Sequence, residues 1–196
     1  QVEATADTAV WNIYINTQLP SISEAVAKVD LDTKALIEYL VSQGISASEI
    51  TSYGVSTSTA YEVANGTQTS NIIGYVANNS IRVRTKEVQK VKKATENIGQ
   101  VLQTGISASS GTPEYYLSNL AELRPKVIEE AVADAKTRAT AMVAAIGGSV
   151  GDPISGSSGS VQVNPPDSVE SDYGSYDTST IDKSVRAVVS VTFKVN

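Results

Sequence analysis

Carboxylates gather near the C-terminal end of the chain, in a segment where Gly, Ser and Pro are also frequent. Carboxylate oxygens are the ligands that Ca²⁺ prefers in proteins, so a cation site is one hypothesis for these side chains. Their spacing does not match an EF-hand loop, which needs a central Gly and a terminal bidentate Glu. A mobile, solubilising acidic loop at about residues 165–182 is therefore the preferred interpretation. The carboxylates concerned are Asp167, Glu170, Asp172, Asp177 and Asp182.

The chain contains neither His nor Cys. Their absence excludes the Ser-His-Asp and Cys-His nucleophile systems, and it removes the commonest transition-metal ligand. A Ser-Lys dyad is the nucleophile system that the composition still permits, but no S-x-x-K stands in a recognisable site context. We therefore expect no catalytic residue, no cofactor-binding residue and no metal ligand, and we predict that the chain is not an enzyme.

Three other polar groups favour a structural interpretation over a chemical one. Glu129 and Glu130 are adjacent, so they leave a helix in different directions and make a poor acid/base pair. The stretch "SGSSGS", residues 155–160, resembles a phosphate loop only in its Gly content, because no Lys follows it. A basic cluster could meet anionic lipid headgroups, although a solvated helix face is preferred. This cluster comprises Arg82, Arg84, Lys86, Lys90, Lys92 and Lys93.

The stretch "EVANGTQTSNIIGYVANNSIRVRT", residues 62–85, allows either a ligand-binding loop or a β-hairpin. Asn65-Gly66 is a strong hairpin signal, because both residues tolerate positive φ. The Thr and Ser residues around it indicate a longer, mobile tip rather than a minimal turn. Asn78 and Asn79 could bind a ligand, but a β-bulge or a solvent-facing pair is the preferred interpretation.

Hydrophobic periodicity supplies the elements that position these groups. Strict alternation predicts strands, and apolar residues at helical spacing predict helices. In the third helix Pro125 fits best in the first turn, which moves the start toward Leu123. The predicted strands are 8–20, 48–63, 72–85, 154–163 and 183–195, with a short extended segment at 106–118. The predicted helices are 21–44, 86–105 and about 119–146.

This order, β-α-β-β-α-β-α-β-β, predicts an α+β fold with a mainly antiparallel sheet and packed helices. We expect the strands that contain Val10, Ile50, Ile73 and Val185 to join one sheet, covered by all three helices. No interior linker interrupts the pattern, so a single domain is expected over residues 1–196.

Charge and hydropathy limit the possible partners. The net charge of −6 and the pI of about 4.7 argue against a nucleic-acid binder, which needs a basic surface. No stretch has the length of a membrane span. Gln1 stands in the middle of a sequence pattern, with no basic or apolar segment of a signal peptide before it. We therefore expect the chain to start downstream of a removed signal or a missing membrane anchor. The absence of Cys suits an oxidising compartment.

Several motifs together resemble the SIMPL-domain family, formerly a domain of unknown function. They are the opening "EATADTAVWNI", the step from Gly44-Ile45 to Glu49-Ile50, the segment "PEYYLSNLAELRPKVIEEAVADAKTRA", the exit "IGGSVGDP" and the closing "KSVRAVVSVTF". The order and spacing of these motifs cover nearly the whole chain. The acidic loop at 165–182 departs from the family in composition.

The resemblance implies a bacterial or archaeal envelope protein, with an N-terminal membrane anchor in this subgroup. Some relatives form hollow ring-like oligomers and some are tied to oxidative-stress tolerance, while no catalytic residues are established. We therefore expect a non-catalytic periplasmic or extracytoplasmic module, anchored to the inner membrane when full-length. Its expected partners are copies of itself or another envelope protein, and no nucleic acid. The alternative is a small-ligand-binding protein or an enzyme with an unrecognised pocket.

Overall fold

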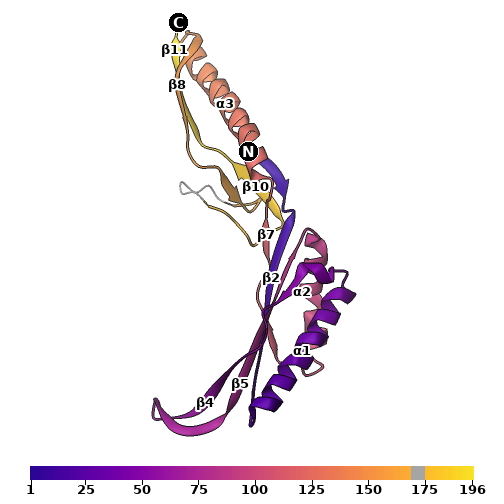
Figure 1. Ribbon diagram of the computed structural model, residues 1–196. Helices are drawn as coiled ribbons and strands as arrows, with labels where there is room; N and C mark the ends of the chain where they lie inside the picture. The colour runs from indigo at the N-terminus through magenta and orange to yellow at the C-terminus, as the bar shows by residue number, and fades with distance from the viewer. Residues whose placement is uncertain (169–174) are drawn as a thin grey trace. The chain divides into compact units, whose positions relative to one another are not determined.

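The structure is a computed structural model that describes residues 1–168 and 175–196. It confirms the α+β class, because α-helices combine with antiparallel sheets. The chain forms two compact units (Figure 1): unit 1 contains residues 1–7 and 115–196, and unit 2 contains residues 8–114. The expectation of one domain concerns independent folding, so it stays a prediction. Among the described residues, no helix is both long and apolar enough to cross a membrane.

Unit 2 follows a β-α-β-β-α-β path in which the second strand is interrupted and forms β3 and β4. Its strands form an antiparallel sheet in the order β3-β5-β2-β6, with β4 also pairing with β5. This is the split βαβ arrangement, in which two crossover helices pack on the same side of the sheet. The elements are β2 (Thr8–Leu19), α1 (Ile22–Ser42), η1 (Ala47–Glu49), β3 (Ile50–Ser52), β4 (Ser56–Ala64), β5 (Thr67–Thr85), α2 (Val88–Leu102) and β6 (Ala108–Ser110).

Local sequence explains where α1 begins and ends. The side chain of Ser21 caps its N-terminus by accepting a hydrogen bond from the backbone N–H of Glu24 (3.3 Å). After the helix, Gly44 takes a φ of 86°, a conformation that favours Gly. Between these ends, the residues at helical spacing are buried: Ala25, Val29, Leu36 and Leu40.

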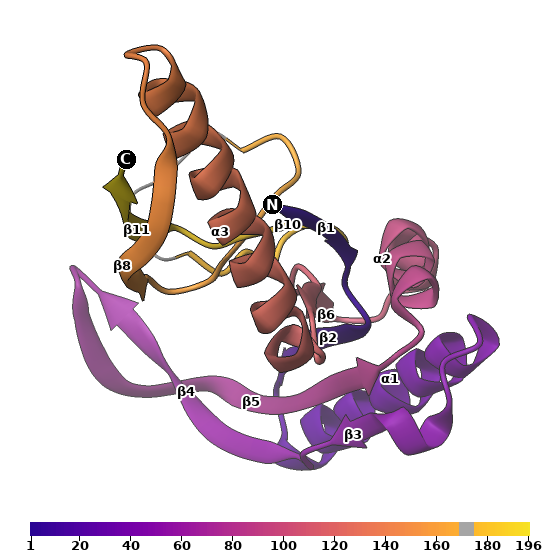
Figure 2. The same cartoon turned by 90° about the horizontal axis from the view of Figure 1, so that it is seen from above.

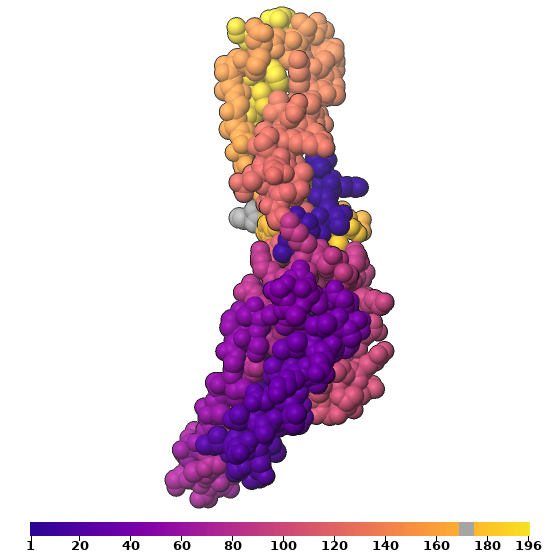
Figure 3. All heavy atoms as spheres, turned by 45° about the vertical axis from the view of Figure 1, so that its right-hand side comes forward, coloured from indigo at the N-terminus to yellow at the C-terminus, as the bar shows by residue number. Residues whose placement is uncertain are grey.

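The two faces of the unit 2 sheet differ completely. Alternation along β2 and β5 places the odd-numbered residues, such as Ile13 and Ile81, in the core beneath α1 and α2. In Figure 3 the indigo atoms of α1 form the outer surface over this side of the sheet. The even-numbered residues lie on the helix-free face, where Tyr14 is exposed. From Asn12 onward along β2 this face is largely polar and at least partly exposed, whereas Val10, nearer the start of the strand, is buried.

The pairing of β2 with β5 continues without interruption over eleven residue pairs, from Ala9↔Thr85 to Leu19↔Tyr75. Beyond Tyr75, strand β5 continues with β4 as its partner as far as the pair Ala64↔Thr67. We call this two-stranded ribbon, residues 60–74, the hairpin arm; it is visible as the curved β4–β5 extension in Figures 1 and 2.

The tip of the arm is a two-residue turn, with φ of 50° at Asn65 and 78° at Gly66. Both residues therefore have the positive φ of a type I′ turn. The prediction of a longer tip was wrong, because pairing extends to the residues that flank the turn. Two register shifts lie between Ala60 and Val63 and bend the ribbon.

Unit 1 contains two separate small sheets and one long helix. One sheet has the order β1-β10-β9 and the other pairs β11 with β8, all antiparallel. Its buried cluster consists of Leu117, Val127, Val163, Val185 and Ala187. The elements are β1 (Val2–Thr5), α3 (Leu120–Ala144), β8 (Val150–Ser158), β9 (Gln162–Asn164), β10 (Asp182–Arg186) and β11 (Val189–Val195); β7 (Glu114–Tyr116) stands where the chain passes from unit 2 to unit 1.

The expectation of one continuous sheet was therefore wrong. The strand of Val185 pairs with β1 and β9, and α3 belongs to unit 1 rather than to the layer that covers β2 and β5. Periodicity correctly identified these segments as a strand and a helix. Periodicity contains no information about which strands pair with each other, and the pairing determines how many sheets form.

Four predicted boundaries also differ. The closing strand breaks at residues 187–188 into β10 and β11, and the strand expected over 154–163 is divided into β8 and β9. The strand expected over 48–63 starts with the short helix η1 and breaks at residues 53–55. Helix α3 begins at Leu120, so Pro125 lies inside it rather than in its first turn. Packing of the residues around Val127 outweighs the hydrogen bond that a Pro removes.

Gly74 marks the point where the arm leaves the sheet, and we predict that its replacement weakens unit 2. Its φ is 148°, and an added Cβ would lie 2.9 Å from the backbone oxygen of Leu19. Gly74→Ala should lower the free energy of unfolding by about 1–3 kcal/mol. The fluorescence of Trp11, the sole Trp of the chain and fully buried in unit 2, reports urea unfolding of this unit.

Gly99→Ala is the matched control, because Gly99 lies in α2 and an added Cβ there meets no atom within 4 Å. This substitution should stabilise by up to about 1 kcal/mol, since Ala is the better helix former. Equal effects of the two substitutions would contradict the argument.

Candidate functional site

The hairpin arm exposes large apolar side chains to solvent. Val63 is 66% exposed, and Ile72 and Ile73 are 55% and 56% exposed. Tyr61 pairs directly with Ile72, so these two side chains share one face of the ribbon. Isolated exposed apolar residues are ordinary on protein surfaces, whereas several on one projecting element mark an interaction site.

The backbone edges of the arm are also unprotected. Within the described residues, β4 pairs with β5 alone, and residues 67–74 of β5 pair with β4 alone. Natural sheets usually protect such edges with Lys, Pro or charge. From residue 56 to residue 74 there is no Lys, Arg or Pro, and Glu62 is the only formally charged side chain. The arm therefore offers both backbone hydrogen-bonding groups and apolar contact area.

The neighbouring residues Asn78 and Asn79 point to opposite sides of the sheet. Asn79 is buried, and its side-chain amide donates to Thr33 Oγ1 (3.0 Å) and to Ser52 Oγ (2.9 Å). Asn78 lies on the helix-free face, where its side-chain oxygen accepts a hydrogen bond from Asn16. The β2–β5 register is regular at both positions. The interpretation of these residues as a β-bulge or a solvent-facing pair was therefore wrong: the register has no bulge, and Asn79 is buried and connects β5 with α1 and β3.

Among the described residues of unit 1, the most buried ion pair joins Lys183 to Asp177. The side chain of Lys183 is fully buried and that of Asp177 is 12% exposed. Lys183 Nζ lies 2.6 Å from Asp177 Oδ2 and 2.7 Å from the Asp177 backbone oxygen. The same carboxylate accepts hydrogen bonds from the backbone and hydroxyl groups of Ser179 and Thr180. This cluster attaches the segment around Asp177 to strand β10.

These contacts determine the protonation of Asp177. Burial acts to raise its pKa, but the hydrogen bonds from Lys183 and from two hydroxyl groups outweigh that effect. The pKa of Asp177 is therefore held well below its ordinary value, and the carboxylate is charged at neutral pH.

Part of the predicted acidic loop is held in place by hydrogen bonds. We call this part, residues 175–181, the strap. Asp177 forms an ion pair with Lys183. The backbone N–H of Val163 donates to the backbone oxygen of Ser175, and the backbone oxygen of Val163 accepts from the N–H of Asp177. Glu170 and Asp172 lie outside the described residues, as does the central part of the loop. In the described part of the chain, no three carboxylates come together in a way that could hold a metal ion.

A second buried carboxylate, Asp32, lies in unit 2. Lys28 Nζ lies 2.5 Å from Asp32 Oδ1, and the backbone N–H of Ser107 donates to Asp32 Oδ2 (3.0 Å). Lys28 also donates to the backbone oxygen of Gly105 (2.9 Å). This network attaches α1 to the segment between α2 and β6. The sequence analysis considered Asp177 only as a member of a mobile acidic loop and did not single out Asp32, although the i,i+4 spacing of Lys28 and Asp32 was available as a signal.

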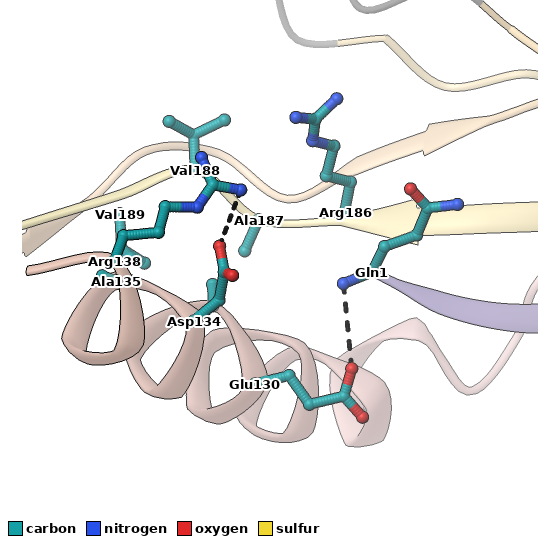
Figure 4. Close-up of a pocket in the computed structure, with 10 residues that line it drawn as sticks. Gln1, Glu130, Asp134, Ala135, Arg138, Arg186, Ala187, Val188 and Val189 are labelled. Atoms are coloured by element: carbon teal, nitrogen blue, oxygen red, sulfur yellow. Dashed lines mark ion pairs between the residues drawn. The ribbon is translucent and has the colours of Figure 1, made fainter. Parts of the chain in front are cut away.

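A groove of about 440 Å³ runs between α3 and the β10–β11 junction of unit 1 (Figure 4). Several polar groups line it: Asp134 lies 2.8 Å from Arg138, Glu130 lies 3.7 Å from the backbone nitrogen of Gln1, and Arg186 is a further member of the lining. Small apolar residues, including Ala135 and Ala187, line the rest.

The remaining predicted groups are separated or used structurally. Glu129 and Glu130 are both exposed on α3, and residues 155–158 form part of strand β8. The basic cluster is divided: Arg82 and Arg84 lie on the helix-free face of the sheet, and the lysines from Lys90 onward lie on α2, on the opposite side. Clustering in the sequence therefore does not produce one basic patch.

Motif residues near the start of the chain also have structural roles. Trp11 is buried, and its indole N–H donates to the backbone oxygen of Gly111 (2.8 Å) and to Ser110 Oγ (3.1 Å). Asp7 accepts hydrogen bonds from the backbone N–H (2.9 Å) and the hydroxyl (2.5 Å) of Ser118. The hydrogen bonds of Trp11 and Asp7 give both motif residues a role in holding the fold together.

Comparison with known protein families gives one match. A family model described as SIMPL, protein of unknown function (DUF541), matches residues 1–193. No curated protein matches the chain.

We predict that Asp177→Ala destabilises unit 1 by about 3–5 kcal/mol, because it leaves the buried Lys183 ammonium without its carboxylate. Hydrogen exchange of the backbone amides of β10 measures this loss. Asp134→Ala is the control: it breaks the exposed pair with Arg138 and should cost less than about 1 kcal/mol. Similar losses in both variants would contradict a special role for the buried pair.

The same pair predicts a pH dependence. The pKa of Asp177 is lower in the folded chain than in the unfolded chain, so its stabilisation is complete above about pH 4 and is lost as the pH falls. Exchange of the β10 amides should therefore accelerate relative to the intrinsic rate in acid. In Asp177→Asn this part of the acid dependence should be absent, and an unchanged profile would refute the assignment.

Proposed function

We propose, from the premise that the chain belongs to the SIMPL family of proteins of unknown function, that it is a non-catalytic module that associates through its hairpin arm. The partner is another copy of the chain or a different envelope protein. The module works outside the cytoplasm, and its full-length form is anchored to a membrane.

The observation that carries this proposal is the exposed arm. It combines two open backbone edges with the apolar side chains of Tyr61, Val63, Ile72 and Ile73. An added strand would satisfy the edge N–H and C=O groups, and the side chains would supply apolar area at the contact. Because the arm carries one formal charge, electrostatic repulsion between two copies is small.

The composition supports a non-catalytic role. Without His and Cys, general acid/base and nucleophilic chemistry would rest on carboxylates, Lys, Ser or Tyr. Among the described residues, the most buried Lys and its carboxylate partner form a hydrogen-bonded pair that stabilises the fold. The extracytoplasmic location rests on the lack of Cys, which suits an oxidising compartment. A membrane tether would raise the local concentration of copies, so modest contacts would suffice.

We predict that charge on the arm abolishes association. Val63→Lys combined with Ile73→Lys places two ammonium groups on the ribbon, where they oppose strand addition. Sedimentation velocity over a range of protein concentrations should show association of the wild-type chain, weakened at least about tenfold in this variant.

Leu31→Lys is the matched control, because Leu31 is 64% exposed on α1, and it should associate like the wild type. A wild-type chain that stays monomeric at high concentration would leave partner binding as the test. If the arm variant then captures the same envelope proteins as the wild type, the proposed function is wrong.

A further inference from the structure

The helix-free face of unit 2 contains a concavity of about 460 Å³ near the base of the hairpin arm. Strands β2 and β5 form its floor, and the connection from β3 to β4 forms one wall. All of its lining residues belong to unit 2. This size lies in the range typical of ligand pockets, and the helices that cover the opposite face leave this side open.

Two exposed tyrosines flank the centre of this concavity. Tyr14 on β2 lies directly opposite Ser80 on β5, and Tyr53 approaches Ser80 from the other side through a backbone hydrogen bond (3.1 Å). Tyr14 is 53% exposed and Tyr53 is 62% exposed. The two residues stand about two strand spacings apart, roughly 10 Å. They therefore form an aromatic platform wide enough for two linked rings.

A row of amide and hydroxyl groups runs beside the tyrosines. Asn16 donates its side-chain N–H to the side-chain oxygen of Asn78, and Ser56 lies directly opposite Asn78 on β4. An Asn side chain has one acceptor oxygen and two donor hydrogens. The mutual bond therefore leaves the Asn16 oxygen as an acceptor and the Asn78 amide as a donor, both on the accessible face. Asn79, buried beneath, keeps this part of β5 in place.

The charge of the concavity selects among ligand classes. None of the residues that line it carries a formal charge. Arg82 and Arg84 share this face of the sheet but lie outside the lining, farther along β5 toward its C-terminal end. Phosphate and carboxylate ligands need cationic partners, and an aromatic sheet that binds single-stranded nucleic acid also needs a basic groove for the backbone. A ligand with hydroxyl groups at its edges and apolar ring faces matches tyrosines beside neutral amides. Oligosaccharides have this combination.

We infer that the helix-free face of unit 2 binds an uncharged oligosaccharide. Tyr14 and Tyr53 stack on the faces of the sugar rings, and Asn16 and Asn78 hydrogen-bond to ring substituents. Each amide offers both a donor and an acceptor to the ligand, so vicinal hydroxyls, which are donors and acceptors themselves, are suitable partners. This site is separate from association through the tip of the arm, and each can fail without the other.

Isothermal titration calorimetry with two neutral probes tests the inference: the N-acetylglucosamine tetramer and maltotetraose, which differ in linkage and substituents. At least one should bind the wild-type chain with saturation. Tyr14→Ala and Asn16→Ala should each weaken binding about tenfold or more, as loss of aromatic stacking does elsewhere. Tyr14→Phe keeps the ring and should keep most of the affinity.

Leu31→Ala is the matched control, since Leu31 is an exposed apolar residue on α1 and lies outside the concavity; its affinity for the sugar should equal that of the wild type. Buried Trp11 fluorescence checks that each variant folds. The inference is overturned if neither tetramer binds, if Tyr14→Ala binds as the wild type does, or if Leu31→Ala weakens binding as much as Tyr14→Ala does. Tighter binding of a thymidine oligonucleotide than of either sugar would also overturn it.

Discussion

The uninterrupted pairing of β2 with β5 is the constraint on which unit 2 depends. Eleven consecutive pairs fix which residues of both strands face the helices, because a shift of one residue would turn every side chain to the other face. The same register places Tyr14 beside Ser80 and Asn16 beside Asn78. It also determines where the arm starts, since β5 is longer than β2 and its excess length has β4 as its only partner among the described residues. One register thus produces the core, the polar face and the arm.

Buried polar groups in both units serve to attach segments to each other. Lys183 and Asp177 attach a strap to β10, Asp32 attaches α1 to the segment before β6, and Asn79 connects β5 with α1 and β3. No buried side-chain polar atom of the described residues lacks a hydrogen-bond partner. Such saturated networks help to specify a single fold. Recognition is expected on the surface, where the arm and the helix-free face are accessible.

Sequence patterns predicted the local structure of the chain well. Alternation identified β2 and β5, helical spacing identified α1 and α2, and Asn65-Gly66 identified the hairpin, because each depends on residues close together in the sequence. The assignment of Val185 to the central sheet failed because strand pairing in unit 1 depends on β1 and β9, which are distant in the sequence and too short to show a period. The tip was shorter than predicted, since Thr and Ser residues can pair as strand residues when the turn is favourable.

The candidate surfaces were only partly accessible to sequence reasoning. The lack of charge around Asn65 is visible in the sequence, but the exposure of Ile72 and Ile73 depends on β2 ending at Leu19. Likewise, Asn78 and Asn79 look equivalent until the register places one on the surface and the other in the core. Tyr53 could not be connected with Tyr14, because the break between β3 and β4 that positions it was predicted as continuous strand.

Hydrogen exchange of the arm at increasing protein concentration tests the central claim most directly. If the arm is a contact element, the backbone amides of residues 67–73 that point away from β4 exchange rapidly in dilute protein and become protected as concentration rises. The amides of residues 76–85, which pair with β2, stay protected throughout. The account is contradicted if exchange in residues 67–73 is independent of concentration while another surface of the chain gains protection.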